Sequence, residues 1–354
     1  MNCLSLSLVF LCLCACTAVT PEPSLACQSS GVRCNGSASI AIVGAADNSA
    51  ALLDVATAAA RRFEQAFGER PANTAVVLGG STSAEQNNEL EAAGYPVTLP
   101  WITAADRARL QEQSVRQQVL EQTKTLPKAL QEAALAQALA TVDGQDADAR
   151  ANEIQAGALA HELGHLWFMS AFQPPNGVGE TGHAYGGWAP DWLDETAAIL
   201  LENATLTEQR RAHFFALGDA DVIPLEQFLS MEHPSAQAAK RTDGLLASLI
   251  NDDEQGVSRA VVLTGQEAEE FLRQSGGDVA TNFYAQAQVF SDFLISMTNS
   301  TRVYSSLTTH LSAGGSLARW LAEQGRDWNL PRDTEQLGRR WRDWVAQNDP
   351  DSTP

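Results

Sequence analysis

The sequence predicts an α+β fold, with a small sheet near the N-terminus and a mainly helical remainder. Three short apolar segments, each bordered by glycine, proline or small polar residues, lie before residue 102. Beyond residue 103, apolar side chains mostly recur at helical spacing. With 354 residues, 44% of them hydrophobic, the chain can bury the core of one large domain or of two intimate subdomains.

The predicted strands contain β-branched residues and stop at glycines or prolines. They are residues 37–45, 72–80 and 94–101. Pro96 and Pro100 favour an edge position for the third strand, because the missing N–H then leaves no gap in the sheet. Residues 50–67 carry a helical pattern between the first two strands. A Gln- and Ala-rich helical stretch runs to about Thr141 and is followed by a polar loop, 142–150.

The N-terminus is typical of an exported protein. Its apolar run, residues 4–15, is too short to span a bilayer, and it ends at "LCAC", which resembles a bacterial lipobox with Cys16 at the lipidation position. We expect a signal peptide over 1–15, with ordinary signal-peptidase cleavage as the alternative. The resemblance implies an outer-membrane lipoprotein on the periplasmic face of the bacterial cell envelope, in contact with the membrane only through its anchor.

The cysteines agree with export. Cleavage before Cys16 leaves Cys27 and Cys34 in a tether, residues 16–36, where they can form a disulfide in an oxidising compartment. No cysteine follows residue 34, so a metal site in the body must use His, Asp or Glu. We divide that body into an α/β subdomain, 37–150, and a helical subdomain, 151–350.

Charge excludes one class of partner. Lys and Arg number 23 against 43 Asp and Glu, which gives a formal net charge of −20. A polyanion is repelled at long range by such a chain, so nucleic acid is not expected as a partner.

The strongest motif is "HELGH". His161 and His165 stand four residues apart in a stretch without proline, so on a helix both imidazoles project from one face. Glu162 lies about 100° round that helix, where it can reach a metal-bound water without taking a coordination position. In this H-E-x-x-H pattern zinc activates a water and the glutamate takes its proton. The alternative is a helix that merely carries two histidines.

A catalytic zinc site needs a third protein ligand. The metzincin pattern is excluded because Phe168 and Ala171 occupy its Gly and His positions. Downstream, "DWLDETAAILLEN" predicts a second helix with Asp191 as its N-cap, Glu195 in its first turn and Glu202 two turns further along the same face.

Here the sequence resembles the gluzincin metallopeptidases, in particular the peptidase MA-like and aminopeptidase-N relatives. Their second zinc helix carries W-L-x-E and a further glutamate seven residues later, matched by Trp192, Leu193, Glu195 and Glu202. The resemblance implies a zincin-like fold, Zn²⁺ as cofactor, Glu195 as third ligand and Glu202 as acceptor for a zinc-binding histidine. The spacing departs from the best-known families, since Glu195 follows His165 by 30 positions, which an inserted loop explains.

The same resemblance implies that Tyr284 stabilises the oxyanion at the start of a helix beginning near that residue. The alternative is a core tyrosine, since the residues after it do not match "Y-E-K-G". His183, in the loop between the zinc helices, is a substrate contact, a competing ligand or a solvated side chain. We interpret His213, His233 and His310 as structural.

The sequence thus predicts a secreted zinc-dependent hydrolase, a peptidase acting on a peptide or protein substrate. An extended substrate can pair with the edge strand at 94–101. The exopeptidase signature G-x-M-E-N is absent, so recognition of a free α-amine is not supported. A non-catalytic periplasmic lipoprotein that uses the same fold for binding is the alternative, and the oligomeric state stays open.

Overall fold

The computed structural model describes residues 34–36, 39–44, 49–143, 149–172, 188–218, 220–234, 237 and 277–350. Several sequence predictions fall outside these residues. They are the signal peptide, the lipidation position Cys16, the disulfide partner Cys27 and the loop residue His183. No helix in the described part combines the length and apolarity that a bilayer crossing requires.

A four-stranded sheet lies at the N-terminal end, in the order β1-β2-β3-β4. Its strands are β1 (Cys34–Gly36), β2 (Ile40–Val43), β3 (Thr74–Leu78) and β4 (Val97–Trp101). β1 is antiparallel to β2, whereas β2, β3 and β4 are mutually parallel. The three expected strands are present, and among the described residues β4 is an edge strand, as its prolines predict. β1 was not predicted, since Cys34 was assigned to the tether.

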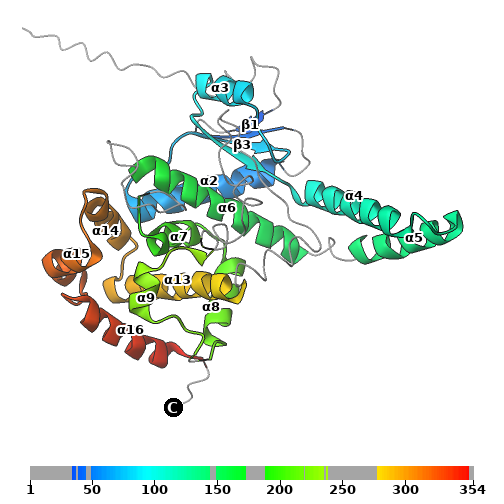
Figure 1. The fold of residues 1–354 in the computed structure, drawn as a ribbon. Helices are drawn as coiled ribbons and strands as arrows, with labels where there is room; N and C mark the ends of the chain where they lie inside the picture. Colours follow the sequence, from blue (N-terminus) through cyan, green and yellow to red (C-terminus); the bar gives the residue numbers. More distant parts are fainter. Residues whose placement is uncertain are drawn as a thin grey trace, which may run out of the picture.

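Both faces of the sheet are covered (Figure 1). Ile40, Ile42 and Val76 face the main core with α2 (Ser49–Phe67) and α6 (Ala149–Phe172). Alternate residues of the same strands form a second cluster with Leu90 of α3 (Ala84–Ala92) and with Tyr95. This alternation follows from the two-residue period of a strand. A strand buried on both faces explains the continuous apolar runs in the sequence.

The C-terminal half is helical. It contains α7 (Asp191–Ile199), α8 (Ala204–Phe215), α9 (Leu225–Ser230), α13 (Gly277–Thr298), α14 (Val303–Ser312), α15 (Leu317–Gln324), the 3₁₀ turn η1 (Gly325–Trp328) and α16 (Thr334–Asn348). α6 packs against α7, and α13 packs against both α7 and α8. Aromatic side chains of α13 and α16, including Phe290, Phe293 and Trp341, interlock in the core. An α+β architecture therefore agrees with the described residues.

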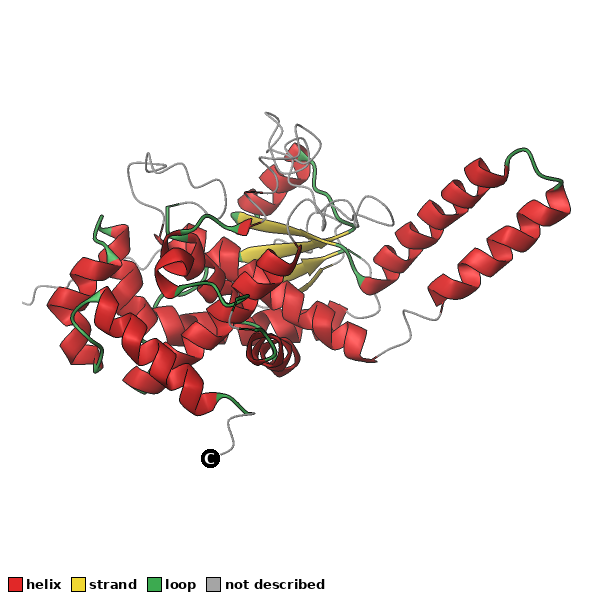
Figure 2. Ribbon diagram, turned by 60° about the horizontal axis from the view of Figure 1, so that its bottom comes forward, coloured by secondary structure: helices red, strands yellow, loops and turns green. Residues whose placement is uncertain are grey.

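Two antiparallel helices, α4 (Ala104–Thr123) and α5 (Lys128–Asp143), form a hairpin that extends from the end of β4 (Figures 1 and 2). None of their side chains whose exposure is described is buried. The two helices pack mainly against each other. The sequence predicts helix here, but nothing in it predicts that the pair projects from the body.

Candidate metal centre

The histidines of the motif lie near the middle of α6, and Gly164 between them allows α7 to approach. A Cβ atom on Gly164 would lie only 2.5 Å from the Ala198 Cα of α7. Glu195 stands on that same helix, three residues before Ala198. The glycine therefore brings the carboxylate of one helix to the imidazoles of the other.

Three side-chain groups converge at this crossing. The Nε2 atoms of His161 and His165 are 3.1 Å apart. The Glu195 carboxylate lies 3.6 Å from each of them, through Oε1 to His161 and Oε2 to His165. All three residues are buried, and their ligand atoms lie within 4.8 Å of one another. The group predicted as metal ligands is thus assembled in one place, where it can hold a metal ion.

The opposite nitrogen of each imidazole faces a carboxylate. His161 Nδ1 is 2.8 Å from Glu202 Oε1, and His165 Nδ1 is 3.0 Å from Asp194 Oδ2. Because a carboxylate accepts, each Nδ1 carries the proton, and a neutral ring then presents a lone pair at Nε2. Two Nε2 atoms 3.1 Å apart can share a cation, either a proton or a metal ion.

The donor set fits zinc. Ligands about 2.0–2.1 Å from a tetrahedral ion lie about 3.3 Å from one another, and the three separations here are 3.1, 3.6 and 3.6 Å. Glu195 is 0% exposed, and neither of its carboxylate oxygens has a hydrogen-bond partner among the described residues. A buried carboxylate without such partners is costly unless a cation neutralises it.

Electrostatics in the metal-free protein point the same way. Burial by itself lowers the pKa of His165, but the carboxylates of Asp194, Glu195 and Glu162 outweigh it and raise this pKa to about 10. Burial raises the pKa of Glu195, but His161, His233, His165 and Arg210 together lower it to about 2. In the metal-free protein the site therefore holds an ionised Glu195 carboxylate beside a protonated His165, whose extra proton a metal ion would displace.

Two predicted positions need correction. Glu202 was expected on the same helical face as Glu195, but α7 ends at Ile199 and Glu202 follows the helix in a turn. It nevertheless reaches His161, as the resemblance implies. Asp191 is the first residue of α7 and Pro190 is the N-cap, whereas Asp191 was expected to be that cap.

Tyr284 lies beside the metal centre, although the helix around it begins earlier than predicted. α13 starts at Gly277, so Tyr284 is in its interior and not at its opening. The Tyr284 ring centroid is 6.3 Å from that of His161 and 5.4 Å from that of His233. The ring is only partly buried. Glu162, on α6, is exposed, and its charge helps to raise the pKa of His165.

Sequence reasoning missed three further residues around the centre. They are Asp194, Arg210 and His233. Arg210 binds both carboxylate oxygens of Glu202, with an Nε–Oε2 distance of 2.8 Å. His233, interpreted above as structural, is fully buried with its Nε2 3.6 Å from Glu195 Oε2. Its backbone N–H donates to Asp191 at the start of α7, which fixes this loop against the helix.

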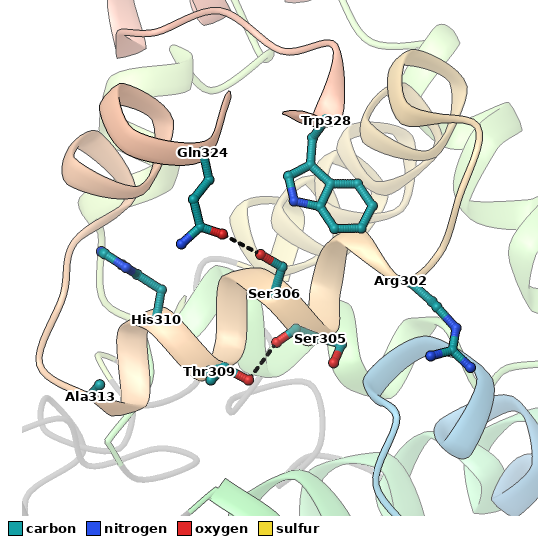
Figure 3. Close-up of a pocket in the computed structure, with 8 residues that line it drawn as sticks. All are labelled: Arg302, Ser305, Ser306, Thr309, His310, Ala313, Gln324 and Trp328. Atoms are coloured by element: carbon teal, nitrogen blue, oxygen red, sulfur yellow. Dashed lines mark hydrogen bonds between the residues drawn. The ribbon is translucent and has the colours of Figure 1, made fainter. Parts of the chain in front are cut away.

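The other described histidines lie elsewhere. His213 is hydrogen-bonded to Asn282 at 2.8 Å and joins α8 to α13, which agrees with a structural role. His310 lines an open cavity of about 560 Å³ between α14 and the α15–η1 segment (Figure 3). Hydroxyl groups of that cavity are bound internally, Ser306 to Gln324 and Thr309 to the Ser305 carbonyl, each at 2.8 Å. None of the predicted site residues lines it.

The comparisons with known proteins do not identify a relative. No protein-family model matches the sequence, and no curated protein or solved structure shows significant similarity to it. The residues of the metal centre therefore carry the functional argument by themselves.

Proposed function

We propose that the protein is a zinc-dependent hydrolase of the gluzincin type, a peptidase with a zincin-like fold that cleaves peptide bonds with an activated water. One observation carries this proposal. His161, His165 and Glu195 converge within bonding range of a single ion, while Glu202 and Asp194 orient the two imidazoles. Carboxylate partners of this kind are typical of catalytic zinc sites.

His161, His165 and Glu195 would supply three protein ligands, which leaves a fourth position for water or substrate. When bound, zinc lowers the pKa of a coordinated water to about 7 and polarises a carbonyl group. Glu162 follows His161 on the same helix, is exposed, and is not one of the three metal-ligating residues. We assign it as the general base that accepts the proton and returns it to the leaving amine.

Tyr284 is assigned as the hydrogen-bond donor to the developing oxyanion. Its ring lies near His161, and Tyr284 is not one of the three metal-ligating residues. Among the described residues β4 is the edge strand of the sheet and contacts α6, and an extended substrate can add to it as a further strand. Because the N-terminus resembles a lipobox, we also propose that the enzyme acts in the bacterial cell envelope.

The test compares wild type with Glu162→Gln, both loaded with zinc, on a diverse peptide library. Since this change keeps the shape and removes the base, the variant should bind zinc like wild type but cleave about 10²–10⁴-fold more slowly. Tyr284→Phe should lower kcat more than it changes KM. The proposal fails if zinc-loaded wild type cleaves no peptide and Glu162→Gln behaves like wild type in every binding assay. The protein would then be better described as a non-catalytic binding protein.

A further inference from the structure

We propose that Arg210 is a positioning residue that holds both sides of the metal centre, the His161 ligand and Tyr284, with one guanidinium group. This inference rests on the proposed function for the role of Tyr284. The part of the inference that concerns zinc binding does not depend on that function. Arg210 lies on α8, and Tyr284 lies on α13, which packs against α8.

On one side Arg210 fixes the acceptor of His161. Its Nε and Nη2 atoms bind the two oxygens of Glu202, whose side chain is 0% exposed. Glu202 Oε1 in turn lies 2.8 Å from His161 Nδ1. A buried carboxylate needs a counter-charge, and a two-pronged guanidinium contact also fixes its orientation. The direction of the His161 lone pair therefore depends on Arg210 through Glu202.

On the other side the same guanidinium contacts the tyrosine ring. Arg210 Cζ lies 4.9 Å from the centroid of Tyr284, within the range of a cation–π interaction. The side chain of Arg210 is only 17% exposed, so this contact is largely shielded from water. The same ring also lies beside the imidazoles of His161 and His233, with centroid distances of 6.3 and 5.4 Å.

Both contacts require arginine in particular. A lysine keeps the positive charge, but its single ammonium cannot bind two carboxylate oxygens in a fixed plane and also lie flat on a ring. Arg210→Lys therefore removes the geometry while retaining the charge. A merely electrostatic role would survive this change, whereas a positioning role would not.

Arg211 offers a matched control. It is the next residue of α8 and forms the same two-pronged contact, with Asp292 at 2.6 and 2.7 Å. Its side chain is 46% exposed and belongs to no contact of the metal centre described above. Arg211→Lys therefore reproduces the chemical change and its effect on helix α8 without touching Glu202 or Tyr284.

The experiment measures zinc affinity by competition with a chromophoric chelator, and kcat and KM at saturating zinc on a peptide that wild type cleaves. Arg210→Lys should weaken zinc binding about 10–100-fold, the usual size for partners of metal ligands. At saturating zinc it should lower kcat more than it changes KM. Arg211→Lys should change neither. If Arg210→Lys does not fold, zinc affinity and kcat are measured on Arg210→Gln, which keeps a planar hydrogen-bond donor.

Double variants identify the route. In a Glu202→Gln background, Arg210→Lys should cost little further zinc affinity, and in a Tyr284→Phe background little further kcat, because residues that act as a unit are non-additive. The proposal is overturned if Arg210→Lys matches Arg211→Lys in zinc affinity and kcat, or if its losses add in full to those of the partner variants. If no peptide is cleaved by any form, the proposed function fails, while zinc affinity still decides the link from Arg210 to His161.

Discussion

Replacing Gly164 with alanine should separate the two helices that carry the metal ligands. A Cβ atom at this position would lie 2.5 Å from Ala198 Cα, 3.0 Å from Ala197 O and 3.1 Å from Ala198 N. All three are backbone atoms, so no change of side-chain rotamer relieves the clash. Since carbon atoms pack best at about 3.5–4.0 Å, α6 and α7 must move apart by about 1 Å.

A movement of this size is large for a metal site. Metal–ligand distances hold within about 0.2 Å, and Glu195 moves with α7 while His161 and His165 stay on α6. Substitution of a residue that hydrogen-bonds a metal ligand usually weakens metal affinity by about 10–100-fold, and Gly164→Ala should weaken zinc affinity by more than that. Overpacking costs about 1–3 kcal/mol of unfolding free energy, against a helix-propensity gain of about 1 kcal/mol for alanine over glycine. The metal-free variant should therefore lose about 0–2 kcal/mol.

Chelator competition and urea unfolding of the metal-free protein measure the two effects. Gly338→Ala on α16 is the matched control, because the nearest atoms to its new Cβ are at 3.8 and 3.9 Å, which is ordinary contact. This control should gain up to about 1 kcal/mol and leave zinc affinity unchanged. A Gly164→Ala protein that binds zinc as tightly as wild type would refute the reasoning that this close helix contact positions Glu195.

Two further predictions concern the ligand set and the hairpin. Metal analysis after dialysis should find about one zinc ion per chain in wild type and in His183→Ala, and much less zinc in Glu195→Ala. If His183→Ala loses the zinc and Glu195→Ala keeps it, the third ligand is His183. Replacing residues 104–143 by a short Gly/Ser linker should leave zinc affinity unchanged, because α4 and α5 contribute no described buried side chain. A large loss of zinc affinity in that variant would show that the hairpin supports the metal centre.

The motif was predictable because its residues are close in sequence. His161 and His165 share a helical face by spacing alone, and the edge position of β4 follows from Pro96 and Pro100. Glu195 came from a resemblance over a few residues, and the structure brings it to the histidines across an interval of 30 positions. Helical spacing thus predicted the two histidine ligands on α6, whereas the ligand on α7 was predicted only from the resemblance to a known family.

Other contacts of the metal centre depend on how the helices pack, which the spacing of residues in the sequence does not indicate. Arg210 reaches Glu202 because a turn after α7 places α8 beside it, and nothing distinguishes Arg210 from Arg211 in the sequence. His233 approaches Glu195 from a loop 38 residues downstream. Asp194 had one usable signal, since it precedes Glu195 on a short helix. A carboxylate next to a ligand is a reasonable candidate partner for the second histidine.

The beginnings of helices were the least predictable feature. α13 begins at Gly277, before Tyr284. The projecting hairpin α4–α5 was also invisible, because an Ala- and Gln-rich helix has the same composition whether it packs on a body or only on one neighbour. Helical propensity decides that a segment is helical, and the tertiary contacts decide where it lies.

X-ray absorption at the zinc edge tests the central claim most directly, since it reports the ligands of the bound ion without needing a substrate. We expect one zinc per chain, bound by two imidazole nitrogens of His161 and His165 and one carboxylate oxygen of Glu195 at about 2.0–2.2 Å, with one further light atom. In Glu195→Ala the carboxylate contribution should disappear. A spectrum with three or more imidazoles, or one that Glu195→Ala leaves unchanged, would contradict the proposed metal centre.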